Sequence, residues 1–136
     1  MSKKFNVLII YKMNGKIIKN IAAITVILLA LDFMYITATR NMFEIQIADV
    51  QRVALQIRPL GGVLCYLLLV IGLYYFIVRE HRPVFDAFLL GLVIYGVYET
   101  TSYALLKKWK WNIVLMDTLW GGILFALTTL ITYKVV

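Results

Sequence analysis

Apolar residues gather in four long blocks along the chain. The blocks cover, approximately, residues 17–39, 60–78, 85–106 and 113–133. Each block is close to the ~20 residues that an α-helix needs to cross ~30 Å of hydrocarbon at ~1.5 Å per residue. A membrane-spanning strand would need only ~9–11 residues and would alternate in polarity. The pattern therefore predicts four transmembrane helices.

The connections between the blocks predict how these helices are arranged. Residues 79–84 and 107–112 form short links, which place consecutive helices antiparallel to each other. Both prolines, Pro59 and Pro83, lie just outside a block, where the missing backbone N–H costs little. We therefore expect an all-α polytopic membrane protein, residues 1–136 forming one transmembrane domain, built as an up-down four-helix bundle.

The link over residues 40–59 is longer and of mixed polarity. Apolar side chains recur in it at helical spacing, with charged side chains at other positions: Phe43, Ile47, Val50, Ala54 and Ile57. This pattern predicts a short amphipathic helix lying in the membrane interface. An irregular loop followed by an early start of the second transmembrane helix is the alternative.

The segment before the first block is apolar but interrupted by lysines. The dipeptide Asn14-Gly15 favours a break between an interfacial segment and the first membrane helix. A β-hairpin turning at the same dipeptide is an alternative, although a lone two-stranded hairpin is only marginally stable. A cleaved signal peptide is a third interpretation, and Asp32 inside the apolar run argues against it.

The composition agrees with a membrane protein and excludes most other classes. Hydrophobic residues make up 62% of the 136 residues and charged residues 15%, and the mean hydropathy is +0.86. A soluble domain would carry roughly 25% charged residues. A soluble globule, a disordered chain, a coiled coil and a collagen-like chain do not fit these values.

The net charge of +7 comes from residues at the ends of the blocks, so it indicates membrane flanks and not a nucleic-acid surface. With four spans, the two termini and residues 79–84 share one side, and that side carries the larger share of the lysines and arginines. The positive-inside rule then predicts that both termini are cytoplasmic. Trp109, Trp111, Tyr11 and Tyr133 fall near the expected water boundaries, as aromatic belts do.

Three carboxylic acids inside the blocks are the main candidate functional residues: Asp32, Glu99 and Asp117. An ionised carboxylate at the bilayer centre costs ~2.5–3.5 kcal/mol on the insertion scale, so such a residue is a functional hypothesis by default. Counting residues to the nearest block end places all three roughly 6–11 Å from the same side. We expect them to share a cavity.

Neighbours on the same helical faces complete the expected binding site. They are aromatic or hydrogen-bonding residues, namely Tyr35, Tyr95, Ser102, Tyr103 and Trp120. Basic residues reaching in from the rim, with Arg40, Lys107 and Lys108 as candidates, are one way to compensate the acids. Partial protonation is the other. The alternative to a binding site is a structural role, in which the acids hydrogen-bond across helices and fix their register.

Other reactive residues are sparse. His81 is the only histidine and Cys65 the only cysteine. We interpret His81 as a solvated link residue and Cys65 as a packing residue. The sequence contains no phosphate-binding loop, zincin motif or nucleophile elbow. We therefore expect no metal site, no cofactor and no catalytic residue set.

The segment over residues 98–122, YETTSYALLKKWKWNIVLMDTLWGG, resembles an uncharacterised family of small four-helix predicted membrane proteins, found in bacteria and large DNA viruses. The resemblance runs over residues 88–133. It extends to Leu31-Asp32-Phe33 in the first block, and to Gly72 and Phe76 in the second. It implies that the usual residues at positions 99 and 102 are Asp and Asn, where this chain has Glu99 and Ser102. The family has no established activity, so the resemblance implies fold and site residues only.

Three functions are compatible with these features. The first is a small binding or transport module, whose carboxylate site takes a proton, a cation or a lipid headgroup. The second is a structural or assembly component of a membrane, for example the internal membrane of a large virus particle under its capsid. The third is a lipid-modifying membrane enzyme with the carboxyl groups as acid and base. The expected partners are membrane lipids, a second copy of the chain or neighbouring membrane or capsid proteins, and no nucleic acid.

Overall fold

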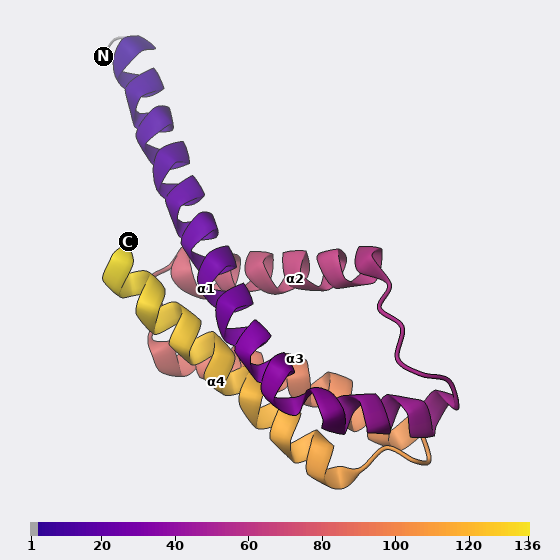
Figure 1. Cartoon of the computed structure of the whole chain (residues 1–136). Coiled ribbons are helices and arrows are strands. Elements are labelled where there is room, and N and C mark those ends of the chain that lie inside the picture. Colours follow the sequence, from indigo (N-terminus) through magenta and orange to yellow (C-terminus); the bar gives the residue numbers. More distant parts are fainter. Residues whose placement is uncertain (1–2) are drawn as a thin grey trace.

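The computed structural model describes residues 3–136, and the elements within them are helical (Figure 1). In chain order they are α1 (Lys3–Gln51), α2 (Pro59–Leu73), the π-helical turn η1 (Tyr74–Val78), α3 (Val84–Leu105) and α4 (Trp111–Val135). Four helices are long and apolar enough to cross a membrane: α1, α2 extended by η1, α3 and α4. The prediction of an all-α polytopic membrane protein with four transmembrane helices is confirmed.

Helix α1 is a single element of 49 residues, which corresponds to a length of about 74 Å. The break expected at Asn14-Gly15 was wrong, because the helix runs through this dipeptide without interruption. One glycine costs a helix only ~1 kcal/mol, which is too little to interrupt a helix of this length. Figure 1 shows that the N-terminal part of α1 projects beyond the other helices.

The C-terminal part of α1, residues 40–51, forms an arm that points in a new direction in Figure 1. Just before it, the hydroxyl groups of Thr37 and Thr39 donate to the carbonyls of Phe33 and Tyr35, each at 2.8 Å. Such bonds to the preceding turn bend helices, which accounts for the change of direction. The helix expected within residues 40–59 is therefore present as a continuation of α1, and residues 52–58 are irregular.

The arm packs against the beginning of α4. Phe43, Ile47 and Val50 contact the buried cluster that contains Trp109 and Ile113. The Gln46 side chain, only 1% exposed, binds the same junction through two hydrogen bonds. Its Nε2 donates to the Lys108 carbonyl at 2.8 Å, and its Oε1 accepts from the Lys110 backbone N–H at 3.1 Å. The part of the apolar stripe that lies in α1 therefore packs against protein, whereas Ala54 and Ile57 are exposed.

Helix α2 packs through its second half only. Its buried residues are Leu69, Val70 and Leu73, and they continue into η1 with Ile77 and Val78. Most residues of the first half are exposed to the surroundings of the molecule. In a bilayer this first half contacts lipid or another chain.

Helices α3 and α4 form the tightest pair, antiparallel across a short link. A Cβ atom built on Gly91 would overlap the Gly121 backbone, and one built on Gly121 would overlap the Tyr95 side chain. Close approach of this kind is how membrane helices gain van der Waals contact without a hydrophobic driving force. The contact fixes Tyr95 of α3 and Asp117 of α4 in the same region, where the candidate site lies.

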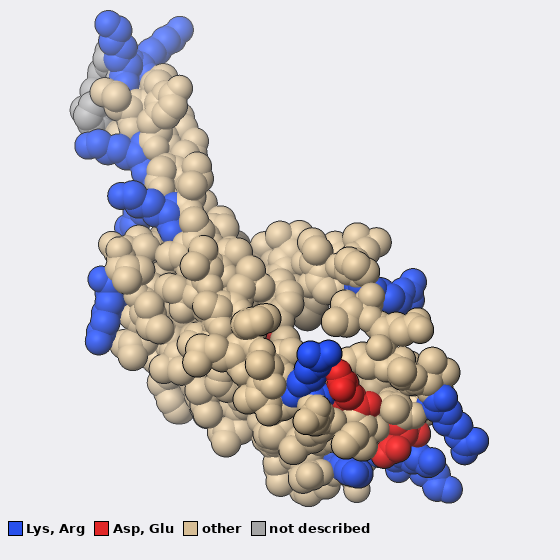
Figure 2. All heavy atoms as spheres, in the orientation of Figure 1, with Lys and Arg blue, Asp and Glu red and all other residues tan. Residues whose placement is uncertain are grey.

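Charged side chains lie at the two ends of the molecule. Figure 2 shows lysine and arginine side chains along the projecting part of α1 and near the end of α4. A second group surrounds the opposite end, and a broad surface without charged side chains separates the two. This distribution is typical of a protein that crosses a bilayer.

Candidate intramembrane carboxyl site

Asp32, Glu99 and Asp117 line one cavity of about 270 Å³. They come from α1, α3 and α4 respectively, and their exposed fractions are 5%, 0% and 8%. The remaining lining is mostly aromatic and aliphatic, and residues of the arm of α1 together with Leu55 contribute to it. The helices thus bring together three acids that lie far apart in the sequence.

Asp32 accepts hydrogen bonds at both carboxyl oxygens. The Tyr66 hydroxyl donates to Oδ2, and the Trp120 indole N–H donates to Oδ1 at 2.9 Å. These donors come from α2 and α4, so Asp32 joins three helices. Each oxygen of this carboxyl group therefore has one hydrogen-bond donor from the protein.

Asp117 is held by Tyr35 of α1, whose hydroxyl donates to Oδ1 at 3.0 Å. The Tyr35 ring stacks on the Trp120 ring with a centroid distance of 4.6 Å and an interplanar angle of 9°. Since Trp120 donates to Asp32, the stacked rings connect the Asp32 and Asp117 positions.

Glu99 has an incomplete set of partners. Its Oε2 accepts from the Trp109 indole N–H at 2.8 Å, whereas its Oε1 is buried and has no donor among the described residues. Asp117 lines the same cavity as Glu99, and both side chains are buried. A proton held between the two carboxyl groups would supply the missing donor.

Basic side chains do not neutralise the three acids. Arg40 lines the cavity, but its Nε pairs with Glu44 at 2.8 Å on the exposed side of the arm. Lys107 and Lys108 line a different hollow, beside Asp49. The ion pairs among residues 3–136 do not include Asp32, Glu99 or Asp117.

A metal ion is not favoured by this arrangement. Within the part of the chain that the structure describes, histidine, cysteine and carboxylate side chains do not form a group of three that could hold one. The acids share the cavity without converging on one point. A metal would also compete with the tyrosine and tryptophan donors that already hold Asp32 and Asp117.

Of the neighbours that the sequence suggested, three take part in the site. Tyr35 and Tyr95 line the cavity, and Trp120 binds Asp32 from the side. Ser102 and Tyr103 do not line it. Tyr103 is half exposed, and its ring lies against Trp111 at 5.2 Å, on the outside of the α3–α4 link.

Two donors escaped the sequence analysis. Trp109 was assigned to an aromatic belt, but it is only 5% exposed and binds Glu99. Its position ten residues after Glu99, across a tight turn between antiparallel helices, was the available signal. Tyr66 has no such signal, because only the packing of α2 on α1 brings it to Asp32.

Comparison with known proteins gives one match. The family model described as "Predicted membrane protein (DUF2177)" matches residues 17–134. The matched range contains all residues that line the carboxyl cavity. Comparisons with curated proteins and with solved structures gave no match.

Proposed function

The chain belongs to the DUF2177 family of predicted membrane proteins, and from this premise we propose that it is a small binding or transport module that holds one positive charge in its intramembrane carboxyl cavity. The first candidate for this positive charge is a proton that Glu99 and Asp117 share. The cavity opens toward the side of the membrane that holds the first and third links.

The buried Glu99 Oε1 atom without a donor carries this proposal. A buried acceptor that has no partner costs roughly 1–3 kcal/mol, and more if it is charged. Two carboxyl groups that share a site cannot both be ionised without strong repulsion. A proton between Glu99 and Asp117 removes both costs, which supports proton binding as the primary chemistry of the cavity.

The size and lining of the cavity limit its other ligands. Its volume of about 270 Å³ is below the roughly 300–1,000 Å³ of typical small-molecule sites, but it accommodates water molecules or a small amine. Tyr35, Tyr95 and Trp109 present aromatic rings to this space, and such rings attract ammonium groups. A protonated amine, free or in a lipid headgroup, is therefore the second candidate, because it carries the same single positive charge.

Infrared difference spectroscopy over a pH titration tests the proposal on the full chain in lipid bilayers. A protonated carboxylic acid has a carbonyl stretching band that a carboxylate lacks. We expect this band at neutral pH in the wild-type protein, and we expect Glu99→Gln and Asp117→Asn each to remove or shift it. Asp86→Asn is the matched control, because Asp86 is a surface acid that pairs with Arg82 outside the cavity.

The results separate the functional from the structural interpretation. Circular dichroism should show that both amide variants insert and remain helical, because the amide keeps the shape of the acid and one hydrogen-bonding oxygen. A wild-type spectrum without a protonated carboxyl band at any pH near neutrality would contradict the proposal. The acids would then act in packing, as expected of a structural membrane component.

We also propose that both termini face the cytoplasm, so that the carboxyl cavity opens toward the opposite side. The support is the distribution of basic residues. Lys3, Lys4, Lys12, Lys16 and Lys19 precede or begin the apolar part of α1. Juxtamembrane lysines of this kind are retained on the cytoplasmic side during insertion.

A further inference from the structure

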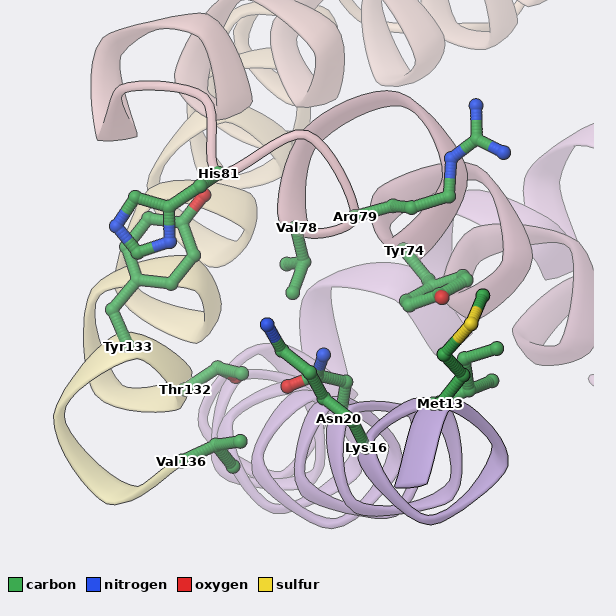
Figure 3. A pocket seen from close by; sticks show the side chains of 11 residues that line it. Met13, Lys16, Asn20, Tyr74, Val78, Arg79, His81, Thr132, Tyr133 and Val136 are labelled. Carbon is green, nitrogen blue, oxygen red and sulfur yellow. The ribbon is translucent and has the colours of Figure 1, made fainter. Parts of the chain in front are cut away.

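A second cavity lies at the end of the molecule opposite the carboxyl site. It has a volume of about 500 Å³ and is enclosed by α1, by η1 with the link that follows it, and by the last turns of α4 (Figure 3). Its polar lining side chains are basic or neutral: Lys16, Asn20, Tyr74, Arg79, His81, Thr132 and Tyr133. Since no Asp or Glu side chain is among them, the lining side chains are complementary to an anion.

One buried polar group in this cavity has no partner among the described residues. The Thr132 Oγ1 atom is fully buried and has no hydrogen-bond partner among the described residues. Asn20 is 8% exposed, and Figure 3 shows its amide beside the Lys16 amine, both directed toward Val78. Buried polar groups normally have partners, so the Thr132 hydroxyl is available to a ligand.

The other basic side chains frame the cavity from its edges. The His81 ring stacks on Tyr133 with centroids 4.2 Å apart, and the Tyr133 hydroxyl donates to the Arg82 carbonyl at 2.6 Å, which fixes this wall. The Arg79 guanidinium extends away from Lys16 in Figure 3 and lies over the Tyr75 ring at 4.1 Å. Lys16 is therefore the main positive charge that points into the space.

An apolar groove of about 800 Å³ begins where this cavity ends. It lies between α1 and α2, and Tyr74 lines both spaces. Along α1 the lining continues directly from Ile17 and Asn20 of the cavity to Ile21, Thr25 and Leu29 of the groove. A basic polar cavity that continues into an apolar groove matches a molecule with an anionic head and a hydrocarbon tail.

We propose that the cavity and the groove together bind one anionic phospholipid, with its phosphate at Lys16, Asn20 and Thr132 and an acyl chain along α1 in the groove. Basic pockets between transmembrane helices are typical sites for anionic headgroups, and the lysines of α1 place this end at headgroup level. The headgroup cavity shares no lining residue with the carboxyl cavity, and the groove meets the carboxyl site only at Tyr66, so the proposal does not depend on the function proposed for the acids.

Native mass spectrometry of the full chain in detergent tests the headgroup part of the site. The protein is titrated with phosphatidylglycerol and, separately, with phosphatidylcholine carrying the same acyl chains. We expect preferential retention of one phosphatidylglycerol. Lys16→Gln should lower this preference about fivefold, the effect of one lysine near an anionic headgroup. Lys12→Gln is the matched control, since Lys12 lies on the same helix outside the cavity.

A second pair of variants tests the acyl chain. Val63 lines the groove and is 64% exposed, so Val63→Trp should fill the groove without disturbing the core and should reduce lipid retention. Leu68→Trp is its control, because Leu68 is similarly exposed at 69% but does not line the groove. Circular dichroism of all four variants should match the wild type.

Three outcomes would overturn the assignment. Equal retention of the two lipids would contradict a site for anionic headgroups. An equal loss of phosphatidylglycerol preference in Lys16→Gln and Lys12→Gln would show that general surface charge, and not the cavity, attracts the lipid. Displacement of phosphatidylglycerol by an equal concentration of glycerol 3-phosphate would show that the ligand is a free phosphate and that the groove contributes nothing. We expect glycerol 3-phosphate to have no effect at that concentration.

Discussion

Replacing Trp109 by phenylalanine removes the one donor that Glu99 has among the described residues. The indole N–H lies 2.8 Å from Oε2, and both residues are buried, with exposed fractions of 5% and 0%. Because Oε1 already lacks a donor, the variant leaves neither carboxyl oxygen with an N–H or O–H donor from another residue among those described. An unpaired buried acceptor costs about 1–3 kcal/mol. With the lost ring contacts, we expect Trp109→Phe to lower the free energy of unfolding by roughly 2–4 kcal/mol.

A double-mutant cycle with Glu99→Met separates the hydrogen bond from the lost volume. A neutral hydrogen bond between membrane helices couples two residues by about 0.6–1.7 kcal/mol. A bond to an ionised group is worth about 1.5–3 kcal/mol. Proton sharing between Glu99 and Asp117 predicts a coupling in the lower range at neutral pH. The coupling should increase as the pH rises, because deprotonation converts the bond into a charge-assisted one.

The assay is unfolding in mixed micelles with a denaturing detergent, followed by circular dichroism at several pH values. Trp111→Phe combined with Glu99→Met is the matched control, because Trp111 is 52% exposed and is not bonded to Glu99. Independent sites add within about 0.3–0.5 kcal/mol. A Trp109–Glu99 coupling no larger than this would refute the hydrogen bond. A coupling above 2 kcal/mol at every pH, larger than a neutral bond provides, would refute a protonated Glu99.

Two further predictions test the packing and the topology. Gly91→Ala should destabilise the protein by about 1–3 kcal/mol, because its new methyl group meets the backbone of α4. Gly72→Ala has open space around the new methyl group and should be neutral or stabilising by up to about 1 kcal/mol. The same unfolding assay measures both variants, and equal effects would contradict the close α3–α4 contact. In a Cys65→Ala background, cysteines placed at Lys4 and at Lys108 should react with an impermeant maleimide from opposite sides of the membrane, with Lys4 on the cytoplasmic side. Labelling of both from one side would contradict a single crossing by α1.

The number of spans was predictable because hydrocarbon imposes a minimum length on every span. Two of the links are also too short for anything except a reversal of direction. The position of the acids followed from the same arithmetic. Asp32, Glu99 and Asp117 lie at similar depths in their blocks, and the structure places all three on one cavity.

The features that sequence reasoning missed depend on packing between segments that are remote in the chain. The arm of α1 resembled an interfacial helix because an apolar stripe looks the same whether lipid or protein covers it. Only the docking of Phe43 and Gln46 at the α3–α4 junction shows that protein covers it here. Tyr66 is a comparable case, because a tyrosine in an apolar span has many orientations and only the crossing of α2 over α1 selects the one that reaches Asp32.

The unequal hydrogen bonding of the three acids argues that they are not present for packing alone. An acid that only fixes helix register is best placed where each oxygen has a donor, as Asp32 has in Tyr66 and Trp120. Glu99 departs from this pattern, because a buried carboxyl group with one free oxygen destabilises the bundle unless something binds there. Leucine at this position would pack against Trp109 without that cost. An acid at this position, sharing a cavity with Asp117, therefore supports the proposal that the site holds a proton or another small cation.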